Sequence, residues 1–94
     1  MNLYETIYIL KPDMEEEAIK ATVEKFKNII EENGEMDTLD EWGKRKLAYP
    51  IQFFKEGYYV YMKFKANSNL PKELDRVFGI TEDVIRHLIV RIDK

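Results

Sequence analysis

The chain alternates between two hydrophobic periods, that of a β-strand and that of an α-helix, in six successive segments. Residues 2–10 form the first segment, an extended stretch with apolar side chains on both faces, as is typical of a central strand. The second segment has helical spacing over about residues 14–33. Asp13 and Glu16 predict a capping box at the start of this helix, and Gly34 follows its end. The apolar stripe of the helix consists of Ile19, Val23, Phe26 and Ile30.

The middle of the chain predicts two further strands. From Glu35 the two-residue period returns, which indicates a half-exposed edge strand with a bulge or bend at Gly43 and an end at Pro50. We expect a loop over residues 52–56. The next strand then begins at Gly57, runs to about residue 66, and is rich in aromatic residues and lysines.

The last two segments are a helix and a strand. Pro71 suits the first turn of the helix, and Gly79 ends it. Residues 84–92 are β-branched and apolar enough for a final strand. This order of elements predicts an α+β, ferredoxin-like β-α-β-β-α-β fold, in which a four-stranded antiparallel sheet carries two helices on one face. We expect residues 1–94 to form one such domain, whose other sheet face stays open unless a partner covers it.

The open face of this predicted sheet mixes aromatic, aliphatic and cationic side chains. We expect Tyr58, Val60, Met62 and Phe64 to face the helices, which turns the intervening residues outward. A slip of one residue would exchange the two faces. Exposed apolar area on a small protein indicates a binding surface. The outward-facing set predicted in this way is Ile7, Ile9, Tyr59, Tyr61, Lys63, Lys65, His87, Ile89 and Arg91.

Charge is divided unevenly along the chain. Residues 1–42 carry 12 acids and 4 Lys or Arg, whereas residues 43–94 carry 6 acids and 11 Lys or Arg, within a net charge of -3. Lys44, Arg45 and Lys46 are consecutive and precede the aromatic-rich strand. Such a combination suits a polyanion such as RNA. The alternative is a solvated edge strand that its charges protect from aggregation.

Composition excludes several other classes of protein. The chain has no cysteine and a single histidine, so neither disulfides nor a two-histidine metal site can form. No apolar run approaches the roughly 20 residues of a membrane span, and the first residues do not resemble a secretory signal, so we expect a cytoplasmic protein. An acyl-phosphate hydrolase on this fold would need a glycine loop with an arginine, which residues 11–14 lack. We expect no enzymatic activity, no cofactor and no small-molecule substrate.

One segment carries a specific family resemblance. Residues 43–51, Gly-Lys-Arg-Lys-Leu-Ala-Tyr-Pro-Ile, resemble the bacterial small-subunit ribosomal protein six family. The resemblance covers nearly the whole chain, although Asn2 and Leu3 stand where some members have arginines. It is also carried by Tyr4-Glu5, Glu56-Gly57-Tyr58-Tyr59, Leu74-Asp75-Arg76 and residues 81–90.

The resemblance implies a structural constituent of the small ribosomal subunit. Members of the family bind the central domain of the small-subunit rRNA together with small-subunit ribosomal protein eighteen. A basic partner of this kind would explain the net acidity of the chain. Carried over, Lys44, Arg45, Lys46 and Arg86 are candidate rRNA contacts. Candidate contacts to the protein partner or to RNA are Tyr49, Tyr59, Tyr61 and Arg91.

Two other functions stay open on the residues alone. The chain could be a non-ribosomal binding module of the same fold. It could also be a regulatory homodimer that hides its open sheet face against a second copy, which sedimentation at different concentrations would reveal.

Overall fold

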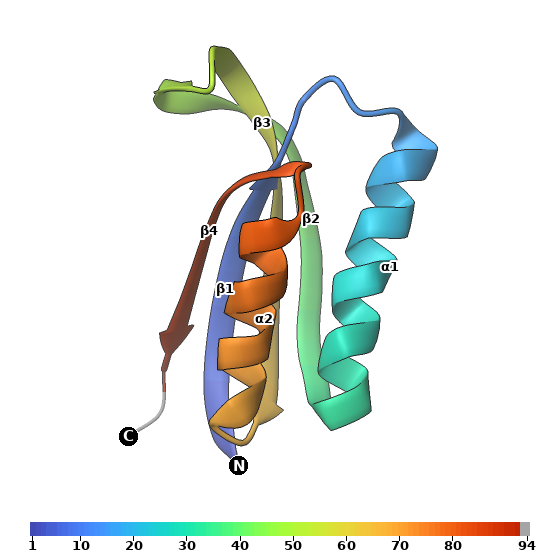
Figure 1. The fold of residues 1–94 in the computed structure, drawn as a ribbon, viewed down its shortest axis with the longest axis vertical. Coiled ribbons are helices and arrows are strands. Elements are labelled where there is room, and N and C mark those ends of the chain that lie inside the picture. Colours follow the sequence, from blue (N-terminus) through green and yellow to red (C-terminus); the bar gives the residue numbers. More distant parts are fainter. Residues whose placement is uncertain (93–94) are drawn as a thin grey trace.

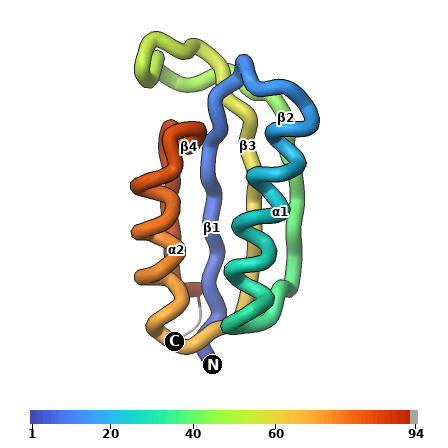
Figure 2. The backbone as a smooth tube through the Cα atoms, turned by 45° about the vertical axis from the view of Figure 1, so that its right-hand side comes forward, coloured from blue at the N-terminus to red at the C-terminus, as the bar shows by residue number. Residues whose placement is uncertain are grey.

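The computed structural model describes residues 1–92 and confirms the predicted fold. Four antiparallel strands form one sheet in the order β2-β3-β1-β4, and both helices lie on the same face of it (Figures 1 and 2). The elements are β1 (Asn2–Leu10), α1 (Glu16–Asn33), β2 (Gly34–Ile51), β3 (Phe54–Ala66), α2 (Asn69–Ile80) and β4 (Val84–Arg91).

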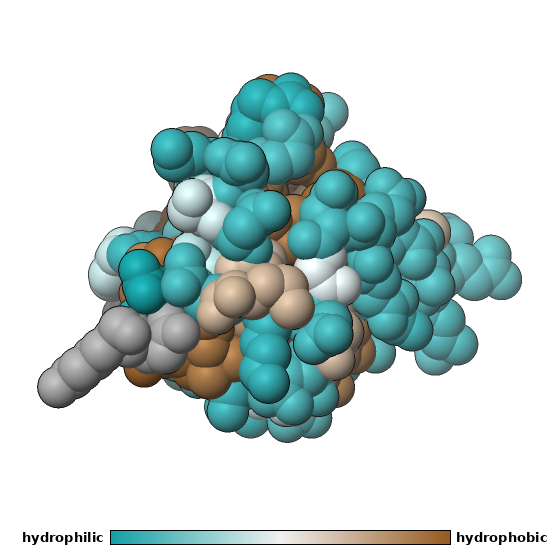
Figure 3. Space-filling view, turned by 90° about the horizontal axis from the view of Figure 1, so that it is seen from below, coloured by the Kyte–Doolittle hydropathy of each residue, from teal (hydrophilic) through white to brown (hydrophobic). Residues whose placement is uncertain are grey.

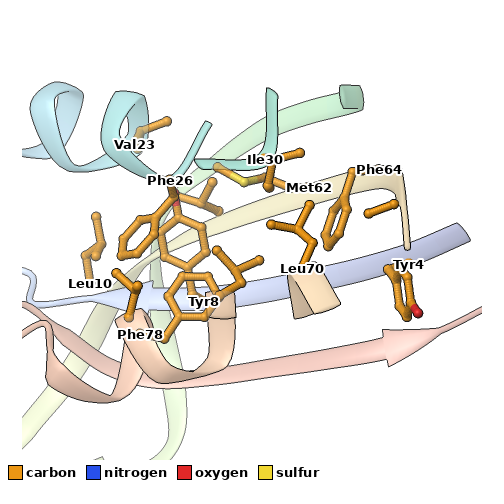
Figure 4. Packing of buried hydrophobic residues seen from close by; sticks show 14 of the residues in the cluster. Tyr4, Tyr8, Leu10, Val23, Phe26, Ile30, Met62, Phe64, Leu70 and Phe78 are labelled. Atoms are coloured by element: carbon orange, nitrogen blue, oxygen red, sulfur yellow. The ribbon is translucent and has the colours of Figure 1, made fainter. Parts of the chain in front are cut away.

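The main core fills the space between the sheet and the helices (Figure 4). Tyr8 of β1, Phe26 of α1 and Phe78 of α2 meet there, with ring centroids 4.5 to 5.0 Å apart. All three side chains are almost completely removed from solvent. Because each ring comes from a different element, this contact fixes both helices on the sheet.

Strand pairing confirms the predicted faces of β1 and β3. Leu10 pairs with Tyr58 and Tyr4 with Phe64, so the side chains of these positions share the face beneath the helices. Tyr59 and Tyr61 therefore lie on the open face.

The predicted face of β4 was wrong. His87, Ile89 and Arg91 pair with Tyr8, Thr6 and Tyr4, which face the helices. The outward residues of β4 are instead Arg86, Leu88 and Val90. Both alternating sets of this strand contain apolar residues, so the hydrophobic pattern alone does not determine its face.

Three predicted boundaries also differ from the structure. The capping box at Asp13 was wrong, because α1 begins at Glu16 and Glu15 precedes it without a side-chain cap. The loop predicted over residues 52–56 consists only of Gln52 and Phe53, since β3 already begins at Phe54. β2 continues past Pro50, which an edge strand tolerates because the missing N–H need not pair.

Candidate functional site

The hairpin between β2 and β3 extends beyond the other strands and bends toward β4 (Figures 1 and 2). We refer to residues 43–57 as the hairpin arm. Leu47 of the arm is buried against Ile9 and Ile85 in a second apolar cluster, on the open face of the sheet. Gly57 permits this approach, because a Cβ atom added there would overlap a methyl group of Ile9. The arm is thus packed onto the sheet.

Tyr49 and Arg86 join the arm to β4. The Arg86 guanidinium donates a hydrogen bond to the Tyr49 hydroxyl and lies over the Tyr49 ring, 5.6 Å from its centroid. This hydrogen bond raises the pKa of Arg86 above its ordinary value. Tyr49 was a candidate partner contact and Arg86 a candidate RNA contact, so the structure brings together two residues from separate predicted groups.

A planar stack occupies the open face below the arm. The register of β2 shifts between Glu41 and Gly43, where Gly43 adopts a φ of 83°, and Trp42 is the extra residue of this bulge. Trp42 stacks on Tyr61, with centroids 5.6 Å apart and planes 3° apart. The Arg45 guanidinium also lies over the Trp42 ring, 5.1 Å from its centroid. The predicted bulge is confirmed, but Trp42 was not among the predicted contact residues.

The hydroxyl of Tyr61 is also fixed. It donates a hydrogen bond of 2.5 Å to a carboxylate oxygen of Glu5 on the neighbouring strand. This hydrogen bond, followed by burial and nearby carboxylates, raises the pKa of Tyr61 to about 12. Lys63, further along the same face, lies 3.8 Å from Asp37. This part of the open face therefore combines aromatic rings with charges of both signs.

The three consecutive cations do not share one surface. Arg45 lies opposite Gly57 on the open face, whereas Lys44 lies opposite Tyr58, on the side of the helices. Lys46 pairs in register with Glu56 but comes within ion-pair distance of no acid in the part of the chain that the structure describes. The cluster therefore presents cations on both sides of the arm.

Arg91 lies apart from the three candidate tyrosines. It lines a shallow hollow at the β4 edge, on the side of the helices, near Tyr4 and Pro71. His87 lies in the same hollow, with Nε2 2.7 Å from a carboxylate oxygen of Asp75 on α2. The structure thus separates Arg91 from the candidate surface formed by Tyr49, Tyr59 and Tyr61.

The end of the molecule opposite the hairpin arm has a different surface. Seen from below, its surface is mainly hydrophilic, with smaller hydrophobic patches between the polar side chains (Figure 3). Within residues 1–92, no three His, Asp or Glu side chains converge to hold a metal ion. In the same described residues, neither α1 nor α2 has an apolar stretch long enough to cross a membrane.

These features define a ferredoxin-like binding domain, with one uncovered sheet face and a basic, aromatic arm. The sequence profile of ribosomal protein S6 matches residues 3–91. The chain is 59% identical over 92 residues to small ribosomal subunit protein bS6 of Clostridium perfringens, covering 97% of each chain. The protein of that name from Clostridium novyi is 55% identical over 95 residues, covering 100% of each chain.

A solved structure agrees with these relatives. The crystal structure of 30S ribosomal protein S6 from Thermotoga maritima has a TM-score of 0.92 and 34% identity, covering 97% of this chain and 87% of that one. The chain belongs to the ribosomal protein S6 family, a family of small-subunit ribosomal proteins. The resemblance carried by residues 43–51 is thereby confirmed.

Proposed function

We propose that this protein binds the central domain of the small-subunit rRNA together with ribosomal protein eighteen, as a structural, non-enzymatic part of the cytoplasmic ribosome. The observation that carries the proposal is the hairpin arm. Residues 43–57 hold four cations and one acid, in a chain whose net charge is -3. A local excess of cations beside aromatic rings favours an RNA ligand.

The open face is the proposed site of the protein partner. Tyr59 and Tyr61 lie on it, and Leu88 and Val90 of β4 add apolar area that is exposed in the chain alone. Exposed apolar area beside acidic groups such as Glu5 fits a basic protein. Arg91 would reach the partner only around the β4 edge, because its strand position faces the helices.

The RNA and protein sites are proposed to border one another along the arm. Arg45 lies over the stack that includes Tyr61, and Arg86 contacts Tyr49. In each of these two groups, the arginine belongs to the proposed RNA site and the tyrosine to the proposed protein site. Because the chain itself is acidic overall, we expect it to bind the RNA weakly alone and much more tightly when the basic partner is present.

Binding of purified components tests this proposal. The chain, ribosomal protein eighteen and a central-domain RNA fragment would be mixed in pairs and all together, over a range of salt concentrations. We expect a stable ternary complex whose affinity falls steeply with salt, and an RNA fragment from another domain serves as the control. Tight binding without the partner, or no ternary complex, would contradict the proposal.

Charge variants test the RNA contacts separately. The double variant Lys44→Ala/Lys46→Ala should weaken ternary complex formation and lower the slope of log affinity against log salt by about 1 for each lost phosphate contact. The matched control is Lys25→Ala/Lys27→Ala on α1, which removes the same charge far along the chain from the arm. Equal loss in both double variants would indicate a general charge effect instead of specific contacts.

A further inference from the structure

The tip of the hairpin arm carries a fully exposed aromatic ring. Phe53 is 100% exposed, more than any other large hydrophobic residue in the described part of the chain. It belongs to neither apolar cluster, whereas the adjacent Phe54 packs against the second cluster. The Phe53 ring therefore does not contribute to the packing of the described residues.

The backbone at this tip would favour another residue. Gln52 and Phe53 have φ values of 50° and 70°, so both central residues of the turn lie in the left-handed region. Hairpin turns of this kind favour Asn-Gly, because glycine enters that region without steric cost. A bulky residue in that region is sterically strained. An exposed phenylalanine at such a position suggests a use outside the fold.

The surroundings of Phe53 indicate which partner it meets. The arm carries Lys44, Arg45, Lys46 and Lys55, and its only acid, Glu56, lies opposite Lys46. Such an arm would repel a basic protein and attract a phosphate backbone. Proteins that read RNA stack unpaired bases on aromatic side chains of this kind.

We propose that Phe53 stacks on an unpaired nucleobase of RNA, while Lys46 and Lys55 contact neighbouring phosphates. This inference rests on the proposed function and specifies the contact made by its arm. The packing of Leu47 and the Arg86–Tyr49 contact hold the arm in place, so the backbone that carries the ring is ordered before RNA binds.

Substitutions of Phe53 test the proposal in the ternary complex with ribosomal protein eighteen and the central-domain RNA fragment. Phe53→Ala and Phe53→Leu should each weaken RNA affinity about tenfold, because an aliphatic side chain cannot stack on a base. Phe53→Trp should retain or raise the affinity. The matched control is Ile80→Ala, which removes a side chain that is 70% exposed at the end of α2 and should change nothing.

The aliphatic variant separates base stacking from a protein contact. If Phe53→Leu kept full affinity while Phe53→Ala lost it, the ring would occupy an apolar protein pocket and the proposal would be overturned. Unchanged affinity in both variants would also overturn it, with the proposed function intact. If the unsubstituted chain formed no ternary complex, the proposed function itself would fail.

Fluorescence gives a direct readout of the stacking. In the Phe53→Trp variant, the emission in excess of the unsubstituted chain reports on the tip alone. We expect ribosomal protein eighteen alone to leave this emission unchanged, and the RNA fragment to quench it when added to the chain together with that protein. Quenching by the protein alone would place the tip against the protein and overturn the inference.

Discussion

Both faces of the sheet carry tyrosines, but different interactions fix these side chains on each face. Tyr8, beneath the helices, is completely buried among the rings of Phe26 and Phe78. Tyr61, on the open face, stacks on Trp42, and its hydroxyl donates a hydrogen bond to Glu5. The covered face is thus held by burial, and the open face by directional contacts that leave one side accessible.

This difference explains how an uncovered face can keep a defined shape. Full burial of a large side chain contributes about 1.5 to 3 kcal/mol, which the open face forgoes. An aromatic pair contributes about 0.5 to 1.5 kcal/mol and a hydrogen bond to a charged group about 1.5 to 3 kcal/mol. The open face can therefore be ordered before a partner arrives, through directional contacts instead of burial. Substitutions should accordingly have their largest effect on folding beneath the helices, where a truncated side chain leaves a cavity.

The largest effect is expected beneath the helices. Phe26→Ala should lower the free energy of unfolding by about 3 to 5 kcal/mol, because it removes a fully buried ring that joins α1 to β1 and α2. Denaturant titration measures the loss. The same chemical change at the exposed Phe53 is the control and should stay within about 0.5 kcal/mol of the unsubstituted chain. Similar losses of unfolding free energy in Phe26→Ala and Phe53→Ala would contradict the claim that burial holds the covered face.

The contact between the arm and the open face should come next. Gly57→Ala adds a methyl group that overlaps Ile9 and should cost about 1 to 3 kcal/mol. Gly79→Ala in α2 is the matched control, because its added Cβ meets no atom within 4 Å and alanine favours a helix. We expect the control to gain about 0.5 to 1 kcal/mol in thermal or denaturant unfolding. A harmless Gly57→Ala would show that the arm is not packed on the sheet.

Two hydroxyl deletions sharpen the comparison between the faces. The Tyr8 hydroxyl is buried without a hydrogen-bond partner among the described residues, so Tyr8→Phe should be neutral or should stabilise the fold by about 1 kcal/mol. Tyr61→Phe removes a hydrogen bond to Glu5 and should destabilise it by about 1 kcal/mol. Both are measured by denaturant unfolding at neutral pH. Equal signs for the two changes would contradict the proposed difference between the faces.

Much of this architecture follows from local pattern. The face of β3 could be predicted because Val60, Met62 and Phe64 are all apolar, so only one phase buries them. The helical stripe from Ile19 to Ile30 likewise determines which side of α1 meets the sheet. Where one alternating set is uniformly apolar, the hydrophobic pattern is sufficient to assign the buried face.

The last strand lacked such a signal. Ile89 in one set and Leu88 and Val90 in the other are all apolar, and the register with β1 decides which set faces the helices. That register also contains an irregularity between Ile9 and Leu10, which a single strand does not reveal. The face of β4 is therefore a property of pairing across the sheet.

The candidate site depended on contacts between distant segments. Leu47 of the bent arm packs against Ile85, and this bend brings Tyr49 to Arg86. Trp42 lies beside the predicted bulge at Gly43, but its stacking on Tyr61 requires the pairing of β2 with β3. Residue types predicted the chemistry of the surface, whereas their grouping required the tertiary structure.

The smallest effect should appear at alkaline pH and involves one tyrosine on each face. Burial and a hydrogen bond to Glu41 raise the pKa of Tyr58 to about 12, and the hydrogen bond to Glu5 and burial raise that of Tyr61 to about 12. An unfolded tyrosine ionises near pH 10. Above that pH the unfolded chain therefore binds fewer protons than the folded chain, and stability falls as pH rises.

The stabilisation from these two hydroxyls should be fully present below pH 10 and decline as pH rises toward 12. Both groups are partly exposed, so solvent screening keeps the change modest. Denaturant midpoints measured at intervals from pH 8 to about 11 should fall less steeply in the double variant Tyr58→Phe/Tyr61→Phe than in the unsubstituted chain. The buried Tyr8, whose pKa burial also raises, should maintain a residual slope in that variant. Parallel pH profiles would mean that neither carboxylate contact persists in solution, which would remove the directional contact that distinguishes Tyr61 from a merely exposed ring.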